Sequence, residues 1–305
     1  AFTPRRYRQL EPSIRAHVVS QIEKMLARDE ATGDFLRDLA YDVPTVTILT
    51  LIGADTSKVD QFKEWSDSRA AMTWEDLTEE EQITHAHNLV AYWQECMRLV
   101  SEAHETNPDS LVGDMVRAQQ AGDEISDHEI ASVVYSMLFA GHETTTTLIS
   151  NAMRVLLSHP DQWQQLVADP TKIGPAIDEV LRYSGSIVAW RRKALADATV
   201  GGVEIPKGAE LLLVMGSANR DEERFAAGEE FDISRENARD HLSFGFGIHY
   251  CLGNMLAKLQ AKIALEEIVR LMPHVRLQDG ADIGFRDNLS FRVPLEVPVT
   301  WKEAA

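Results

Sequence analysis

A single cysteine lies in a glycine-rich loop that leads directly into a helix-forming segment. The loop is the stretch 244–253, with the sequence FGFGIHYCLG, and its cysteine is Cys251. Unpaired N–H groups and the positive dipole at a helix N-terminus favour the thiolate form of a cysteine. The glycines let the backbone turn beneath that sulfur or approach a flat ligand closely. These features slightly favour a metal–thiolate site, and a catalytic nucleophile with His249 as its base is the alternative.

An acid followed by an alcohol interrupts the most helical segment of the chain, residues 126–158. The segment opens with a capping-box sequence, and its apolar middle predicts a buried central rod about 50 Å long. Glu143 and Thr144 then begin a run that includes four threonines, which are poor helix formers. The Thr144 hydroxyl can bond to the carbonyl of Ala140, which bends a helix and opens a groove. We therefore expect Glu143 and Thr144 at a widened turn deep in the core.

A third pattern pairs Glu179 with Arg182, three residues apart on a predicted helix. A pair with this spacing usually lies on the surface and contributes about 0.2–0.5 kcal/mol to helix stability. Alone, the pattern is too short to indicate a function.

The elements that position these residues are mainly helices. The spacing of apolar residues predicts helices over 13–28, 34–52, 57–72, 78–105, 126–158, 160–168, 174–183 and 254–271. Turn residues and β-branched runs predict short strands at 187–190, 198–200 and 211–215, and again within 275–301. No repeat or linker divides the chain, so the predicted fold is one mainly helical domain with a minor β part.

Composition excludes several classes of function. The chain has 305 residues, 44% of them hydrophobic, which is enough for a large core. Its net charge of −18 argues against binding to nucleic acid or to an anionic membrane surface. Two cysteines, Cys96 and Cys251, cannot form a disulfide framework, and no apolar run or signal-peptide pattern predicts a membrane span or export. A cytoplasmic protein is expected.

Together, the three patterns resemble those of the cytochrome P450 family. The haem-binding signature of that family, Phe-Gly-x-Gly-x-His-x-Cys-x-Gly, is matched at every fixed position by residues 244–253. Its Glu-x-x-Arg motif matches Glu179 and Arg182, and its central-helix motif, Ala/Gly-Gly-x-acid-Thr, matches residues 140–144. The motifs follow the family's order, and the resemblance covers essentially the whole chain.

The resemblance implies a haem b whose iron takes Cys251 as its axial thiolate, which favours O–O cleavage. It implies that Glu143 and Thr144 relay protons during dioxygen activation. Glu179 and Arg182 are implied to be structural and to meet Arg235. Further cofactor contacts, including propionate contacts from the last two residues named, are implied at Phe244, Gly245, Gly247, His249, Gly253, Ala140, Gly141, Arg192 and His241.

Substrate-facing positions are suggested by the same resemblance, although each is equally consistent with plain core. They are mostly apolar, which suits an organic, apolar substrate held over the iron. They are Ser136, Phe139 and Ala140 in the central helix, Ile187, Val188 and Ala189 after the Glu-x-x-Arg helix, and Leu289, Ser290 and Phe291 near the C-terminus.

The implied function is a monooxygenase that inserts one oxygen atom of O2 into such a substrate. Electrons would come from NAD(P)H through a ferredoxin or flavin reductase, separate or fused. A peroxide-driven P450 and a non-catalytic haem-binding protein are the alternatives, and the intact Glu143–Thr144 pair disfavours both. Residues 1–6 resemble a segment that follows a helix in bacterial P450s, so we expect residues 1–305 to be a single haem domain that is incomplete at its N-terminus.

Overall fold

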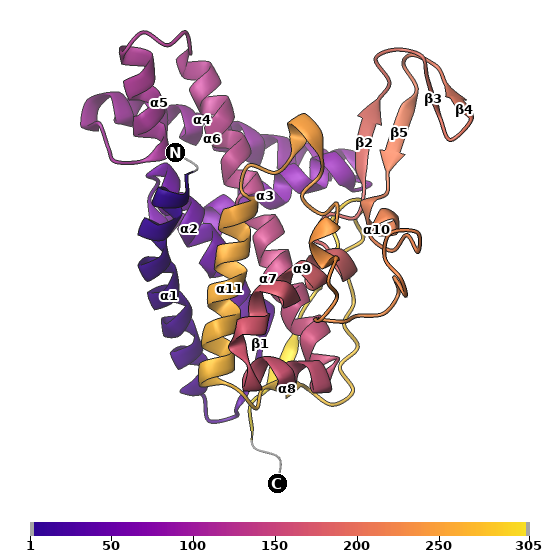
Figure 1. Cartoon of the computed structure of the whole chain (residues 1–305). Helices are drawn as coiled ribbons and strands as arrows, with labels where there is room; N and C mark the ends of the chain where they lie inside the picture. Colours follow the sequence, from indigo (N-terminus) through magenta and orange to yellow (C-terminus); the bar gives the residue numbers. More distant parts are fainter. Residues whose placement is uncertain (1–2, 303–305) are drawn as a thin grey trace.

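The protein, a computed structural model, is described over residues 3–302, and residues 1–2 and 303–305 lie outside the described part. Helices form most of it (Figure 1). The α-helices are α1 (Pro4–Leu26), α2 (Asp42–Ile52), α3 (Val59–Trp74), α4 (Glu79–Thr106), α5 (Leu111–Gln120), α6 (Asp127–Ala140), α7 (Glu143–Leu157), α8 (Pro160–Ala168), α9 (Ile173–Tyr183), α10 (Met215–Ala218) and α11 (Asn254–Leu271). The short helices are the π-helix η1 (Leu36–Ala40) and the 3-10 helices η2 (Thr56–Lys58), η3 (Pro170–Lys172), η4 (Ala238–Asp240) and η5 (Gly247–His249).

The β part consists of three small antiparallel sheets. Two are hairpin-like pairs that project from one side of the helical body (Figure 1). The pairs are β2 (Trp190–Lys193) with β5 (Glu210–Leu213), and β3 (Ala198–Val200) with β4 (Val203–Ile205). The third sheet has the order β1 (Thr32–Asp34), β7 (Pro298–Thr300) and β6 (Arg276–Leu277), and it ties the C-terminal segment to the loop after α1. The predicted mainly helical fold with a minor β part is confirmed.

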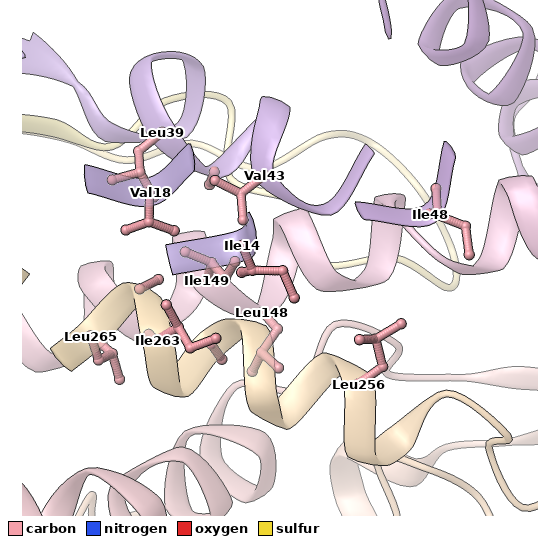
Figure 2. Close-up of a cluster of buried hydrophobic side chains, with 14 of the residues drawn as sticks. Ile14, Val18, Leu39, Val43, Ile48, Leu148, Ile149, Leu256, Ile263 and Leu265 are labelled. Atoms are coloured by element: carbon pink, nitrogen blue, oxygen red, sulfur yellow. The ribbon is translucent and has the colours of Figure 1, made fainter. Parts of the chain in front are cut away.

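The main core lies between α1, η1, α2, α7 and α11. Figure 2 shows aliphatic side chains that converge from these five helices, including Val18 of α1, Ile149 of α7 and Ile263 of α11. All three are buried, and each fully buried side chain of this size stabilises the fold by about 1.5–3 kcal/mol. This core fixes α7 and α11 side by side. α7 begins with Glu143 and Thr144, and α11 follows the cysteine loop.

Two helix boundaries show how the local sequence decides the ends of elements. α1 begins at Pro4 rather than near residue 13, and Pro12 lies inside it, so the predicted start is wrong. The Thr3 hydroxyl accepts the N–H of Arg6, and a proline in the first turn needs no N–H partner, so the helix starts there. The predicted helix 34–52 is confirmed only at its end: β1 and the π-helix η1 occupy its first residues, and α2 begins at Asp42. α2 closes at Gly53 as predicted, with a φ of 92° that suits glycine.

Two further predictions are corrected, and one helix was not predicted. Residues 126–158 form two helices, α6 and α7, rather than one continuous rod, because the backbone breaks at Gly141 and His142. The helix α5 was not predicted from the sequence. The segment from 275 to 301 forms only β6, β7 and two isolated bridges, because its glycines and prolines interrupt longer strands. Among residues 3–302, no helix is both long and apolar enough to cross a membrane.

Candidate active site

The cysteine loop turns back on itself beneath the sulfur of Cys251. Gly245 and Gly247 adopt φ angles of +74° and +67°, a region that other residues rarely enter. The N–H of Cys251 donates to the carbonyl of Phe244 at 2.9 Å, which closes the loop. The sulfur accepts hydrogen bonds from the backbone N–H groups of Gly253 and Asn254, where α11 begins.

The charge state of Cys251 depends on two opposing effects. Burial raises the pKa of its thiol above the ordinary value, and the N–H groups of Gly253 and Asn254 offset only part of that rise. The expected net preference for the thiolate is therefore wrong for the protein alone, because desolvation outweighs the helix terminus. A coordinating metal ion deprotonates a thiol outright, so this donor suits a metal of soft character.

The residues around the sulfur also suit a large apolar ligand. Phe246 and Ile248 are 86% and 98% exposed, and Tyr250, Leu252 and Met255 are more than half exposed. Contiguous exposed apolar side chains of this kind mark a ligand or partner site. A single sulfur donor flanked by an apolar surface fits haem, whose macrocycle is flat and largely apolar. Among residues 3–302, no group of three or more His, Cys, Asp or Glu side chains could hold a metal ion instead.

The break between α6 and α7 matches its sequence prediction only in part: the expected hydrogen bond is present and Glu143 is buried, but Thr144 is half-buried rather than deep in the core. The Thr144 hydroxyl donates to the carbonyl of Ala140 at 3.0 Å. The backbone carbonyl of Thr144 accepts the hydroxyl of Ser186 at 2.6 Å, so the turn is tied to the segment before β2. A Cβ at Gly141 would lie 2.6 Å from Ile48, so only glycine allows α2 to pack this closely against the break.

Glu143 belongs to a buried cluster of charged groups. Its Oε1 lies 3.6 Å from Nζ of Lys63 and 3.3 Å from Nε2 of His142, and the Lys63 ammonium lies 3.9 Å from the centre of the Tyr41 ring. Burial would raise the pKa of Glu143, but the neighbouring His142 and the charge of Lys63 outweigh it and lower the pKa to about 2. Burial also lowers the pKa of Lys63 and outweighs the attraction of Glu143. Glu143 is therefore a carboxylate at neutral pH.

Lys63 and His142 are site residues that the sequence did not predict. The available signal was a lysine on the buried face of α3, since Lys63 follows the core residue Phe62 and precedes the buried Ser66. Lysine is almost never fully buried unless it is paired, and Lys63 is only 1% exposed.

Glu179 and Arg182 form a fully buried, bidentate ion pair rather than a surface pair. Nε and Nη2 of Arg182 each donate to a different oxygen of Glu179 at 2.7 Å. The guanidinium also donates to the carbonyls of Asn219, Gly228 and Glu230. Nε of Arg235 donates to Glu179 at 3.2 Å, so the expected contact is present. This network ties α9 to the irregular segment before the cysteine loop.

The two residues expected at haem propionates have different surroundings. Nε2 of His241 lies 3.8 Å from Asp178, which is also ion-paired with Lys258, and Nδ1 of His241 accepts the N–H of Ser243. Arg192, on β2, donates to the carbonyl of Arg191 and has no carboxylate partner among the residues described. His249 is exposed at the end of η5.

The expected substrate-facing residues divide into two groups. Phe139, Ile187 and Phe291 meet in a small apolar cluster separate from the main core, together with Trp74, Trp190 and Val293. The other residues take structural or solvent-facing positions: Val188 and Ala189 bond to the backbone and side chain of buried Ser290, while Ser136, Ala140 and Leu289 are exposed. Trp74 and Trp190 were not predicted from the sequence to lie here. Trp190 adjoins the predicted range 187–189, which was the available signal.

Comparison with known proteins identifies the family. The family model for cytochrome P450 matches residues 47–172 and 174–281. The chain belongs to the cytochrome P450 family. The chain is 35% identical to putative cytochrome P450 YjiB of Bacillus subtilis over 282 residues, which cover 90% of this chain and 69% of that relative. Cytochrome P450 monooxygenase PikC of Streptomyces venezuelae is 33% identical over 304 residues, covering 99% of this chain and 71% of PikC.

A solved structure resembles this P450 more strongly. It is cytochrome P450 CREJ in complex with (4-ethylphenyl) dihydrogen phosphate, with 70% sequence identity and a TM-score of 0.97, covering 99% of this chain and 75% of that chain. The chain is therefore an oxidoreductase of the P450 monooxygenase class, a family that works with haem, O2 and electrons supplied by a reductase.

Proposed function

We propose that this P450 inserts one atom of O2 into an aromatic phosphate ester at a haem b held by Cys251. The observation that carries the proposal is the geometry of the cysteine loop. Cys251 presents its sulfur at the start of α11 with two backbone N–H donors, inside a complete haem-binding signature. A thiolate-ligated haem supplies dioxygen activation when it is bound.

Residues of the cysteine loop and of the α6–α7 break would hold that haem. Cys251 would ligate the iron, and Phe244 would pack beside the sulfur, with its ring 6.5 Å from that of Tyr250. Gly245, Gly247 and Gly253 would let the loop backbone approach the macrocycle. Ala140 and Gly141 are proposed as further contacts from the helix break, where the Cβ position of Gly141 faces Ile48 of α2. Arg192 and His241 would supply cationic or hydrogen-bonding partners for the propionates, and His249 would be a further contact in the cysteine loop.

Glu143 and Thr144 are proposed to take part in proton delivery during dioxygen activation. The carboxylate of Glu143 is ionised and paired with Lys63, and its low pKa disfavours storage of a proton, so we propose that Oε1 acts by accepting a hydrogen bond that orients a proton-carrying group. Thr144 donates its own hydroxyl hydrogen to Ala140, which leaves the lone pairs of Oγ1 free to accept a hydrogen bond. Glu179, Arg182 and Arg235 are proposed to be structural.

The substrate class rests on two observations. CREJ, 70% identical to this chain, was solved with an aryl phosphate. In this protein, an aromatic surface formed by Trp74, Phe139 and Phe291 lies next to the point where Ser186 is hydrogen-bonded to Thr144. The proposed substrate surroundings also include Ile187 and, at lower priority, Ser136, Val188, Ala189, Leu289 and Ser290.

Electrons are proposed to come from NAD(P)H through a ferredoxin or flavin reductase, either separate or fused, in the cytoplasm. A peroxide-driven reaction is the second candidate. Glu143 and Thr144 count against it, because a reaction that starts from peroxide has less need of a proton-delivering pair.

The test begins with the spectrum of the reduced CO complex. A strongly red-shifted band in the wild type that disappears in Cys251→His supports thiolate ligation, and persistence of that band in the variant contradicts it. Turnover of 4-ethylphenyl phosphate with NADPH and a surrogate reductase then tests the reaction. Product formation with hydrogen peroxide alone, at an equal or higher rate, would favour the second candidate.

A further inference from the structure

The small apolar cluster beside the site is lined by arginines. We call it the aromatic cluster; it consists of Trp74, Phe139, Ile187, Trp190, Phe291 and Val293. The guanidinium of Arg191 lies 4.8 Å from the centre of the Trp74 ring, and that of Arg69 lies 4.7 Å from the Phe139 ring and 4.5 Å from the Tyr135 ring. Stacking of this kind holds each cation in place.

Neither arginine has an acidic partner among residues 3–302. Nη1 of Arg69 donates to the carbonyl of Tyr135 at 3.0 Å, and Nη1 of Arg191 donates to the carbonyl of Thr73 at 3.3 Å. These single bonds leave most of the five N–H donors of each guanidinium available. In a chain with a net charge of −18, two stacked arginines without a carboxylate indicate a site for an external anion.

The two arginines lie at one place in the fold, although they are 122 positions apart in the sequence. The Thr73 hydroxyl donates to the carbonyl of Arg69 at 2.8 Å, and the carbonyl of the same Thr73 accepts Arg191. Trp74 and Trp190, the neighbours of these residues, lie 5.3 Å apart. The last turn of α3 therefore meets β2 here, as Figure 1 shows.

Other cations close to this turn are neutralised. Lys63, the other cation of α3 besides Arg69, is paired with Glu143. Arg286, from the C-terminal segment, is paired with Asp67 of α3 at 2.9 Å. Arg69 is thus the cation of α3 that remains available, and Arg191 reaches the same turn from β2.

We propose that Arg69 and Arg191 bind the phosphate of the substrate while the aromatic cluster holds its ring. This inference rests on the proposed function and deepens it by assigning the residues that select the substrate class. A phosphate monoester carries a charge of about −1.5 to −2 at pH 7 and three acceptor oxygens. The planar guanidinium matches those oxygens with two parallel donors, and partial burial strengthens the interaction. A neutral phenol would gain the ring contacts only.

The test compares two ligands on the haem-loaded full chain by titration calorimetry. The ligands are 4-ethylphenyl phosphate and the neutral 4-ethylphenol, and the variants are Arg69→Met, Arg69→Lys and Arg191→Gln. Each neutral variant should raise the Kd of the phosphate about tenfold or more and leave the Kd of the phenol within about twofold. Arg69→Lys should lose less, because it keeps the charge but not the planar fork.

Arg239→Gln is the matched control, since Arg239 is an exposed arginine of η4 with no ion pair in the described structure. It should leave both ligands unchanged. Equal weakening of phosphate and phenol in the variants, unchanged phosphate binding, or an equal effect of Arg239→Gln would each overturn the inference. If Arg69→Met does not fold, the exposed Arg191→Gln carries the test. If any of these contradicting results appears while the wild type keeps its red-shifted CO band, the assignment of Arg69 and Arg191 fails but the proposed function stands.

Discussion

Nζ of Lys63 lies 3.6 Å from Oε1 of Glu143, and both side chains are buried between α3 and α7. The ion pair joins the helix that ends at the aromatic cluster to the helix break that carries Thr144. Removal of one member of a buried pair leaves the other charged and unpaired, which costs about 3–5 kcal/mol, whereas replacement of both members by apolar groups is often neutral.

Lys63→Met should therefore lower the free energy of unfolding by about 3–5 kcal/mol at pH 7. The double variant Lys63→Met/Glu143→Leu should recover most of that loss. Urea unfolding followed by tryptophan fluorescence measures both. Lys58→Met is the control, because Lys58 forms an ion pair with Glu95 but is half exposed, and it should cost at most about 1 kcal/mol. A double variant as unstable as Lys63→Met would show that the pair is not the source of the effect.

The pKa of Glu143 predicts a specific acid sensitivity. Its value is about 2 in the folded protein against an ordinary value of 4.5. Because the folded pKa is the lower one, ionised Glu143 stabilises the fold above about pH 4.5, and this contribution is lost as the pH falls towards 2. Between pH 5 and pH 3 the wild type should lose roughly 2 kcal/mol that Glu143→Gln, which has no charge to lose, does not. Parallel losses in both proteins, measured by urea unfolding at the two pH values, would count against the low pKa.

The buried Glu179–Arg182 pair should be far more sensitive than its spacing suggests. Arg182→Leu leaves the carboxylate of Glu179 with Arg235 and removes donors from the carbonyls of Asn219, Gly228 and Glu230. The expected loss of unfolding free energy is about 3–5 kcal/mol. Arg98→Leu removes a partly exposed arginine that pairs with Glu95 and Glu102, and should cost at most about 1 kcal/mol. Similar thermal shifts for the two variants would contradict the structural role.

Local patterns predicted the parts of this protein that depend on neighbours in sequence. The cysteine loop, the start of α11 at Asn254 and the Thr144–Ala140 hydrogen bond all follow from spacings of a few residues. What the sequence could not predict are contacts between distant elements. Lys63 meets Glu143 across 80 positions. The pair formed by Glu179 and Arg182 has the i, i+3 spacing of an exposed surface pair, but it is fully buried because η4 and the segment around 228–235 cover it. Tertiary packing decides such cases.

Gly141 offers a test of why α6 and α7 are separate helices. A Cβ at this position would lie 2.6 Å from Cγ1 of Ile48 and 2.8 Å from the carbonyl oxygen of Met137, both closer than real contacts allow. Gly141→Ala should therefore cost about 1–3 kcal/mol of unfolding free energy, because α2 must move away from the break.

The matched control is Gly174→Ala in α9, where a Cβ would meet nothing within 4 Å. There alanine should be neutral or should stabilise the helix by up to about 1 kcal/mol. In an Ile48→Ala background the cost of Gly141→Ala should shrink, since the closest clash is gone and only the contact with Met137 remains. An unchanged cost in that background would mean that the backbone of α6, rather than the approach of α2, requires glycine at the break.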